Sequence, residues 1–415
     1  MLVAVIGQGY VGLPLSLAVV RAGHSVLAVE ADPVRLRALR EGRSYLSDVT
    51  TADLREAAAD ERFVPVPDLT GAEAVDVYLI AVPTPVTGAG TPDLSLLDRA
   101  MDEVARSARP GALVVVESTL YPGALRRHVA PRFTRVSGLR PGTDVHLACS
   151  PERIDPGRDG DHREVPKLLA GLDDTATATA HAFYATVFKD MVPVSSCEVA
   201  EFAKLLENTF RYLNIAFVNE LSVAADAMGV SFREVVAAAS SKPYGFLPFS
   251  HGPGVGGHCL PNNVRYLGHA LAAAGTPSTL LESARRVNES RPAYVVDRLR
   301  RSLVRRGGDL AGAEVLLLGL SYKAGVPDIR ESPTLAIGDA IASAGARVRI
   351  ADPRADTGDV RLPSLVELTP RQCARSDAVV LVTDHDEMDY DMVLAHAPLL
   401  LDCRGRFNHP RVEQL

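Results

Sequence analysis

Short apolar runs recur along the first part of the chain and alternate with helical patterns. The runs at residues 2–6, 25–29, 75–82, 113–117 and 145–149 are predicted strands, and residues 13–21 are predicted to form a helix. Strands that alternate with helices indicate a doubly wound sheet, in which the carboxyl ends of the strands line a ligand crevice.

The middle of the chain is predicted to be helical. Side chains recur at helical spacing along a glycine-free run over residues 198–228, namely Phe202, Leu205, Leu206, Thr209, Leu213, Phe217 and Leu221. Helical patterns resume over 264–274 and 280–304, and Pro292 is expected to break or restart the second. A helical region of this size often carries a dimer interface.

A second α/β unit is expected to close the chain. Residues 315–318, 348–351, 379–382 and 399–401 are predicted strands of a parallel sheet, and residues 333–344 a helix. The chain is therefore predicted to be an α/β protein with two Rossmann-like doubly wound domains joined by a long helical linker.

Composition agrees with several globular domains and excludes other classes. The chain has 415 residues, 47% of them hydrophobic, a formal net charge of -7 and a pI of about 5.9. This balance argues against a nucleic-acid binder with a broad basic face. We expect no signal peptide and no membrane span. Five scattered cysteines without CxxC spacing indicate a reducing cytoplasm and no structural zinc.

A dinucleotide fingerprint follows the first predicted strand. Its residues are Gly7, Gly9, Tyr10, Val11 and Gly12, and the second strand ends at Glu30. Glycines allow a tight turn and close approach of a pyrophosphate to a helix N-terminus, and a carboxylate can accept the ribose hydroxyls. We expect NAD rather than NADP, because the carboxylate would repel a 2′-phosphate. A glycine-rich turn without a nucleotide is the alternative.

Candidate site residues follow three other strands of this domain. They are Val82-Pro83-Thr84, Ser118-Thr119 and Glu152-Arg153, and they are expected at the edge where nicotinamide and substrate would lie. An acidic residue after a strand is equally well a solvated loop residue, so the position of Glu152 alone does not decide its role.

Two further groups of residues carry candidate chemistry. Lys204 and Asn208 are four apart on one helix face, where solvation is the ordinary explanation. Glycine-rich residues 252–257, which include Gly254, Gly256 and Gly257, precede His258 and Cys259. This loop either admits a ligand to the backbone and presents the thiol, or is a tight turn beside a buried cysteine.

Cations end the strands of the second α/β unit. Lys323, Arg330 and Arg404 are placed to meet phosphate groups, and no GxGxxG recurs there, so a second NAD is not expected.

In these motifs and in their order along the sequence, the chain resembles the nucleotide-sugar 6-dehydrogenase family, which comprises UDP-glucose, GDP-mannose and UDP-N-acetylhexosamine dehydrogenases. The motifs are GYVGLP, Val82 to Pro85, Glu117-Ser118-Thr119, the Ser-Pro-Glu-Arg sequence from residue 150, residues 201–208, the glycine-cysteine loop and residues 319–332. The resemblance implies an NAD-binding Rossmann domain (1–196), a helical dimerisation domain with the cysteine loop (197–306) and a nucleotide-sugar-binding domain (307–415).

The resemblance also implies a reaction. Two NAD-dependent oxidations would convert the C6 alcohol of the sugar to a uronate through a thiohemiacetal and a thioester on Cys259. Lys204 would stabilise oxyanion charge, Asn208 would share that work or orient water, and Glu152 would activate water. Thr119 would lie near the reacting centre.

The same resemblance implies the ligand contacts. Cofactor would be bound by the fingerprint, Glu30, Val82, Pro83, Thr84, Ser118, Thr119 and Arg330. Substrate would be bound by Glu152, Arg153, Lys204, Asn208, Gly254, Gly256, Gly257, Lys323 and Arg404. No metal is implied.

One position departs from the family pattern. The family usually reads Cys-x-Pro-x-Asp, with the aspartate in the proton and water network, whereas this chain has Asn263 there. Either Glu152 covers the role, or the second oxidation is slowed, or the site suits an unusual substrate. We expect activity to survive.

The sequence is compatible with more than one sugar substrate and with more than one class of protein. His258 and the sequence Ser-Pro-Glu-Arg-Ile-x-Pro-Gly from residue 150 resemble the UDP-N-acetylhexosamine branch. UDP-glucose or dTDP-glucose is the alternative. A weakened nucleotide-sugar-binding paralogue would fit Asn263, and a two-electron dehydrogenase would share the Lys-x-x-x-Asn helix but would not need Cys259.

Overall fold

Two compact units make up the protein, each built around its own sheet. The computed structural model describes residues 1–46, 48–72, 74–153, 164–355 and 365–415. The first unit comprises Met1–Glu207 and Arg265–Pro277, and the second comprises Asn208–Val264 and Ser278–Leu415. The predicted helical region at 197–306 therefore contributes to both.

The first unit contains an eight-stranded sheet in the order β3-β2-β1-β4-β5-β6-β7-β8. Its strands are β1 (Leu2–Ile6), β2 (Ser25–Val29), β3 (Phe63–Val66), β4 (Val77–Ile80), β5 (Leu113–Val116), β6 (His146–Cys149), β7 (Lys167–Gly171) and β8 (Met191–Pro193). All neighbours pair in parallel except β6 and β7, which are antiparallel. This exception brings the start of β7 to the edge where the parallel strands end.

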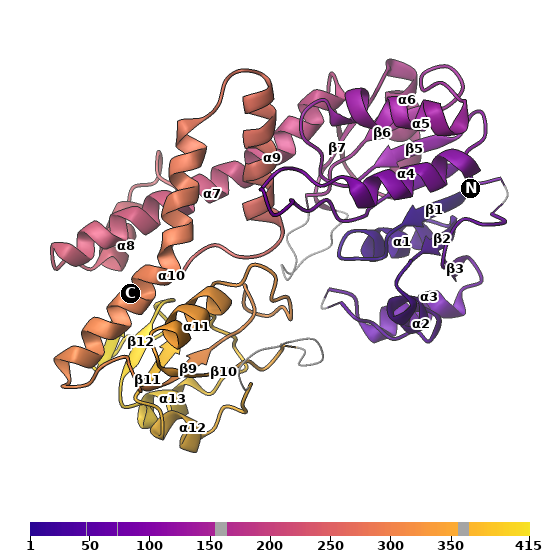
Figure 1. Ribbon diagram of the computed structural model, residues 1–415. Helices are drawn as coiled ribbons and strands as arrows, with labels where there is room; N and C mark the ends of the chain where they lie inside the picture. The colour runs from indigo at the N-terminus through magenta and orange to yellow at the C-terminus, as the bar shows by residue number, and fades with distance from the viewer. Residues whose placement is uncertain (47, 73, 154–163, 356–364) are drawn as a thin grey trace. The chain divides into compact units, whose positions relative to one another are not determined.

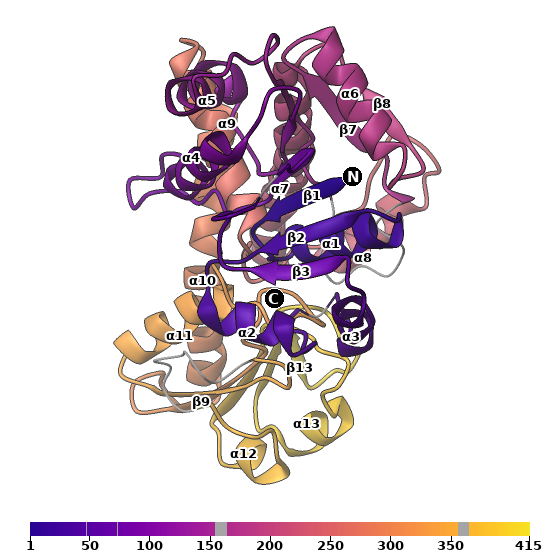
Figure 2. The same cartoon turned by 90° about the vertical axis from the view of Figure 1, so that its right-hand side faces the viewer.

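Helices cover both faces of this sheet, with α4 and α5 on one side and α6 on the other (Figure 2). The helical segments are α1 (Gly12–Arg21), α2 (Pro33–Arg40), α3 (Thr51–Ala59), α4 (Ser95–Ser107), the π-helix η1 (Leu125–Val129), α5 (Ala130–Ser137) and α6 (Asp174–Tyr184). Local signals mark the starts of two of them: Asp32 caps α2 by accepting from the N–H groups of Val34 and Arg35, and Thr50 and Asp53 form a capping box on α3.

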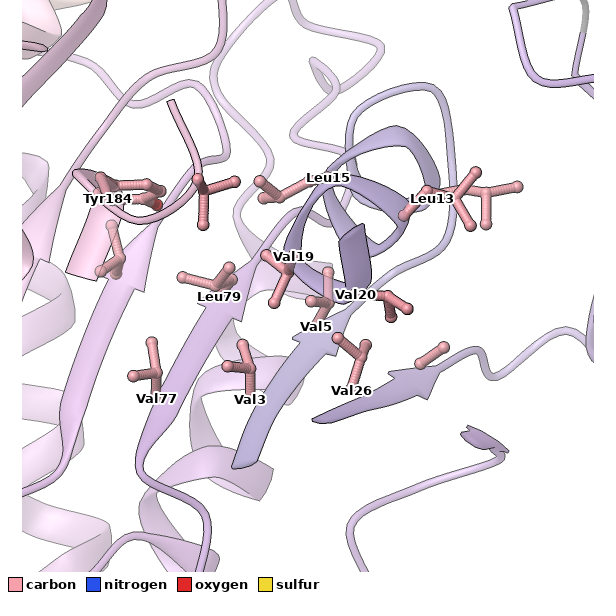
Figure 3. Close-up of a cluster of buried hydrophobic side chains, with 14 of the residues drawn as sticks. Val3, Val5, Leu13, Leu15, Val19, Val20, Val26, Val77, Leu79 and Tyr184 are labelled. Carbon is pink, nitrogen blue, oxygen red and sulfur yellow. The ribbon is translucent and has the colours of Figure 1, made fainter. Parts of the chain in front are cut away.

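The core of the first unit joins alternate side chains of the central strands to α1. Val3 and Val5 of β1 and Leu79 of β4 point toward Leu15 and Val19 of α1 (Figure 3). This burial is the main favourable contribution to the stability of the layer, since each fully buried aliphatic side chain contributes roughly 1.5–3 kcal/mol.

The second unit contains a five-stranded parallel sheet in the order β10-β9-β11-β12-β13. Its strands are β9 (Glu314–Leu318), β10 (Arg347–Ala351), β11 (Ala378–Leu381), β12 (Leu400–Asp402) and β13 (Val412–Gln414), and its helices are α11 (Pro333–Ser343), α12 (Pro370–Ala374) and α13 (Tyr390–His396). One hydrophobic cluster joins the sheet to α10 and α11, which lie side by side (Figure 1), and another joins it to α12 and α13.

Four helices form the predicted helical region: α7 (Cys197–Ala227), α8 (Phe232–Ser240), α9 (Cys259–Ala273) and α10 (Thr279–Arg305). In the described parts of the chain, no helix has both the length and the apolar character needed to cross a membrane.

The fold class and most predicted elements are confirmed, with ends that differ by a few residues. The strands β3, β7, β8 and β13 were not predicted, because β3 and β8 contain proline, a lysine begins β7, and two of the three residues of β13 are polar. The predicted break at Pro292 is wrong, since α10 runs through it. The adjacent Arg291 is 1% exposed and donates to the carbonyls of Gly252 and Asn219, so tertiary contacts hold the helix where proline removes one backbone hydrogen bond.

Helix α7 presents an apolar stripe to solvent. Leu205 and Thr209 are buried, but Leu206, Phe210, Phe217 and Leu221 are 55%, 47%, 60% and 39% exposed. At about 100° per residue, these four lie within about 60° of one another around the helix.

Candidate active site

The fingerprint loop has the backbone that a dinucleotide requires. Gly7 has φ +91°, and a Cβ on Gly12 would lie 1.7 Å from the carbonyl oxygen of Gly7, so helix and strand approach too closely for any side chain. A Cβ on Gly9 would meet nothing within 4 Å. Open space above Gly9, at the start of α1, fits the pyrophosphate of NAD. Tyr10 and Val11 lie half-buried in the same turn.

Glu30 and Gln8 hold this loop to the second strand. The carboxylate of Glu30 accepts from the N–H groups of Gln8 (3.1 Å) and Asp32 (2.9 Å). The fully buried side chain of Gln8 donates to the carbonyl of Val5 and accepts from Ser16. Gln8 was not predicted as a functional residue. Its buried amide explains why a polar residue stands between the first two glycines.

Hydrogen bonds join the ends of β4 and β5. Thr84 donates to the carbonyl of Thr119 at 2.9 Å, and Ser118 donates to the carbonyl of Val82 at 2.7 Å. The hydroxyl of Tyr266 in α9 donates to the carbonyls of Thr84 and Pro85, at 3.0 Å each. The structure thus brings together the predicted cofactor segment at 82–84 and the predicted pair at 118–119.

Glu152 lies beside two lysines at the same edge of the sheet. Its Oε2 is 2.8 Å from Nζ of Lys167, and its Oε1 accepts from the N–H of Arg153 at 2.6 Å. Burial on its own would raise the pKa of Glu152, but Lys167, the Arg153 N–H and the charge of Lys204 together lower it. Lys204 is 8% exposed, so a purely solvated role for it is excluded. Lys167 was not predicted as a site residue.

Arg153 is engaged within its own unit. Its guanidinium forms two hydrogen bonds with the carboxylate of Glu207, at 2.5 and 3.1 Å, and a third with the carbonyl of Pro166. Its predicted contact with substrate stays a prediction. Residues 154–157 of the motif that begins at Ser150 lie outside the described residues.

The glycine-rich loop packs against the segment 322–333 of its own unit. A Cβ on Gly256 would lie 2.6 Å from the carbonyl oxygen of Glu331, and a Cβ on Gly257 would lie 2.7 Å from the ring of Tyr322. Gly254 and Gly257 have φ of +146° and +82°. These glycines therefore allow close approach of other parts of the protein, and their predicted contact with a ligand stays a prediction.

Cys259 is the first residue of α9 and the only exposed cysteine among the five, none of which is in a disulfide. It therefore begins the helix rather than ending the loop. Burial, and then the charge of Arg330, lower the pKa of the neighbouring His258. The alternative of a buried cysteine is excluded.

Two side-chain amide nitrogens of the second unit are buried and have unmet hydrogen-bonding capacity. Among the described residues, neither Nδ2 of Asn208 nor Nδ2 of Asn263 has an acceptor within reach. Asn263 is 5% exposed and lies one turn after Cys259 in α9. Buried amide donors normally have a partner, so these two are suited to a ligand or to ordered water.

The three predicted phosphate contacts differ in their surroundings. Arg404 donates from Nε to the carbonyl of Val382 at 2.6 Å, and burial lowers its pKa. Arg330 is exposed, its guanidinium is hydrogen-bonded to both carboxylate oxygens of Asp328, and its carbonyl accepts from the N–H of Gly257 at 3.0 Å. Lys323 is half-buried in the loop after β9. Across the described residues, no group of three or more His, Cys, Asp or Glu side chains could hold a metal ion.

A dinucleotide loop on a doubly wound sheet, a second parallel sheet and a solvent-accessible thiol define an NAD-dependent dehydrogenase. The chain matches the NAD binding domain of the UDP-glucose/GDP-mannose dehydrogenase family at residues 1–191, the central domain at 198–290 and the UDP binding domain at 316–409. The chain therefore belongs to the UDP-glucose/GDP-mannose dehydrogenase family of nucleotide-sugar 6-dehydrogenases.

Similar proteins carry several substrate names. The chain is 33% identical over 389 residues to UDP-N-acetyl-D-glucosamine 6-dehydrogenase of Pseudomonas aeruginosa, covering 93% of this chain and 90% of that protein. The structure of UDP-D-ManNAc dehydrogenase from Pyrococcus horikoshii matches with a TM-score of 0.90 and 29% identity, covering 100% and 99% of the two chains. The structure of a UDP-glucose dehydrogenase from Pyrobaculum islandicum matches with a TM-score of 0.85 and 27% identity, covering 97% of this chain and 94% of that chain. Fold similarity therefore does not separate the sugars.

Proposed function

We propose that this protein oxidises the C6 hydroxyl of a UDP-N-acetylhexosamine to the uronate, in two oxidations joined by a covalent intermediate on Cys259. The observation that carries the proposal is an exposed thiol at the start of α9, in a chain whose other cysteines are buried. When bound, NAD⁺ supplies the hydride acceptor for both oxidations.

The chain's own residues account for the steps that follow the first oxidation. The first oxidation gives an aldehyde at C6, and the sulfur of Cys259 adds to that carbon while the carbonyl oxygen takes a proton, which gives a thiohemiacetal. Lys204 and Asn208 stabilise the oxyanion. Loss of the second hydride and of the hydroxyl proton leaves a thioester.

Hydrolysis then releases the product. Glu152 takes a proton from water, the water oxygen bonds to the thioester carbon, and the carbon–sulfur bond breaks so that sulfur leaves with the electron pair. The ionised state of Glu152 that the two lysines favour supports this role. Thr119, at the adjoining strand end, borders the reacting centre.

Asn263 changes the group next to Cys259 from a carboxylate to an amide. An amide cannot act as a base, so Glu152 is the base in this proposal. The buried Nδ2 of Asn263, without an acceptor, supports a role as donor to the substrate oxygen or to water.

The remaining predicted residues bind the two ligands. Gly7 to Gly12, Glu30, residues 82–84, Ser118 and Arg330 contact NAD, and Arg153, the glycines of the 252–257 loop, Lys323 and Arg404 contact the nucleotide sugar. The open space at Gly9 and the cationic groups after β9 and β12 support this division.

The sugar is assigned from two kinds of similarity. The P. aeruginosa and P. horikoshii proteins are named for N-acetylhexosamine substrates, and His258 resembles that branch. The Pyrobaculum protein, named for UDP-glucose, has nearly as similar a fold. UDP-glucose or dTDP-glucose is therefore the second candidate.

We also propose a cytoplasmic homodimer. The exposed stripe Leu206, Phe210, Phe217 and Leu221 of α7 has the composition of an interface core, and a second copy of the chain is its occupant. The five cysteines outside disulfides support a reducing compartment.

The test is the number of NADH molecules formed per sugar consumed, measured with UDP-linked N-acetylglucosamine, N-acetylmannosamine, N-acetylgalactosamine and glucose, and with dTDP-glucose. Two NADH and a uronate from an N-acetylhexosamine are expected. A clear preference for glucose would overturn the sugar assignment, one NADH per sugar would indicate a two-electron dehydrogenase, and none would indicate a binding paralogue.

A further inference from the structure

Lys167 occupies a position in the sheet that its strand pairing explains. Strand β7 is antiparallel to β6, with Cys149 opposite Ala170. Continuing that register by three residues places Lys167 opposite Glu152, at the edge where β5 and β6 end. The first residue of β7 therefore reaches the carboxylates that follow the parallel strands.

The lysine is buried between two carboxylates. Its Nζ lies 2.5 Å from Oε2 of Glu117 and 2.8 Å from Oε2 of Glu152, and the side chains of Lys167, Glu117 and Glu152 are 3%, 0% and 11% exposed. The rings of Tyr184 and Phe188 lie 5.7 and 5.2 Å from Nζ. Aromatic surroundings exclude water, so the attraction between these charges is much stronger than at a surface.

The two carboxylates differ in their remaining contacts. Glu117 also accepts from the hydroxyl of Tyr184, whereas Glu152 accepts from the N–H of Arg153 and lies in the field of Lys204. Burial raises the pKa of Glu117, while the pKa of Glu152 is lowered. Because one lysine serves both carboxylates, they titrate as a coupled pair.

We propose that Lys167 is the positioning residue for Glu152, holding its carboxylate in one orientation as the base that activates water in thioester hydrolysis, with Glu117, which accepts a hydrogen bond from Tyr184, as the second carboxylate that holds the lysine in place. The inference rests on the proposed function, since it concerns the step assigned to Glu152. Lys167 itself touches neither water nor substrate in this account.

The variant Lys167→Met tests the inference, with Lys189→Met as matched control. Lys189 is in the same unit, 65% exposed and paired with Glu164 at 3.0 Å, so its loss removes a surface ion pair only. The readouts are NADH release before and during steady state, the mass of the protein during turnover, and the pH profile of kcat. Lys167→Arg, which keeps the cation, is the conservative variant.

Lys167→Met is expected to release about two NADH per active site rapidly and then to turn over at least about 10-fold more slowly than wild type, with the sugar acyl group retained on Cys259. The acid limb of its kcat profile moves to higher pH, because loss of the cation raises the pKa of Glu152. Lys167→Arg recovers part of the rate and moves the limb back.

A second variant keeps the test decisive if Lys167→Met does not fold. Glu117→Gln gives Lys167 a single carboxylate partner, so the acid limb moves to lower pH, and an unchanged or raised limb would overturn the inference. If wild type forms two NADH per sugar and Lys167→Met has the same turnover rate and pH profile as Lys189→Met, this inference alone is overturned. Wild type without NADH from any sugar would overturn the proposed function and the inference together.

Discussion

Glu201 gives the protein a pH-dependent stability that can be calculated from its surroundings. The side chain is 1% exposed, and its two oxygens accept from the N–H groups of Gly123 (2.5 Å) and Leu125 (2.9 Å). It ties α7, one turn before Lys204, to the start of η1. Burial raises its pKa to about 7, aided by the charge of Glu198 and opposed by the two N–H groups.

The sign follows from proton binding. The folded pKa lies above the ordinary value of 4.5, so between these values the folded protein holds a proton that the unfolded chain has lost. The free energy of unfolding contributed by this group is therefore full below about pH 4.5 and falls as pH rises through about 7. A shift of about 2.5 pKa units corresponds to roughly 3 kcal/mol lost by pH 8.

The perturbation is Glu201→Gln, which keeps a hydrogen-bond acceptor but cannot ionise. Urea unfolding followed by circular dichroism from pH 5 to pH 8 gives the assay. Relative to wild type, the unfolding free energy of the variant should rise by about 2.5 kcal/mol between pH 5 and pH 8.

The matched control is Glu198→Gln, one turn earlier in α7. Burial on its own would raise the pKa of Glu198, but the hydrogen bond and charge of Arg126, with hydrogen bonds from its own N–H and from Ser196, together lower it. This variant should therefore lose stability relative to wild type above about pH 4.5. A difference between wild type and Glu201→Gln that stays flat within about 0.5 kcal/mol across pH 5–8 would refute the reasoning.

Three further changes have directions that the structure fixes. Gly257→Ala should destabilise the protein by more than about 1 kcal/mol, because φ is +82° and a Cβ there would lie 2.7 Å from the Tyr322 ring. Gly268→Ala in α9, where a Cβ meets nothing within 4 Å, should stabilise the protein by up to about 1 kcal/mol. Equal shifts of the melting temperature in the two variants would contradict this. Phe217→Ser should convert a dimer to monomers in light scattering, and a monomeric wild type at micromolar concentration would rule the interface out. Asn263→Asp should leave two NADH per sugar, and a rise in kcat would show that the amide limits turnover.

The main chain of this site was predictable because its signals are local. The fingerprint glycines, the strand ends at Thr84, Thr119 and Glu152, and the cysteine after the glycine-rich loop all follow from short-range pattern. Periodicity also predicted α7 over almost its full length.

Features that depend on long-range pairing were not predictable in this way. Lys167 reaches Glu152 only because β7 is antiparallel to β6, and a five-residue strand that begins with lysine gives no signal of its direction. The need for glycine at position 257 comes from Tyr322, 65 residues later in the sequence. Pro292 marked a helix end by local rules, but buried contacts of Arg291 override them.

The most direct test of the account is the acid product formed by Cys259→Ala compared with wild type on the favoured sugar. Wild type should form the uronate with two NADH per sugar, and the variant should form no net uronate, because no thioester can be made. A variant that still yields the uronate with two NADH would contradict the central claim that chemistry on Cys259 joins the two oxidations.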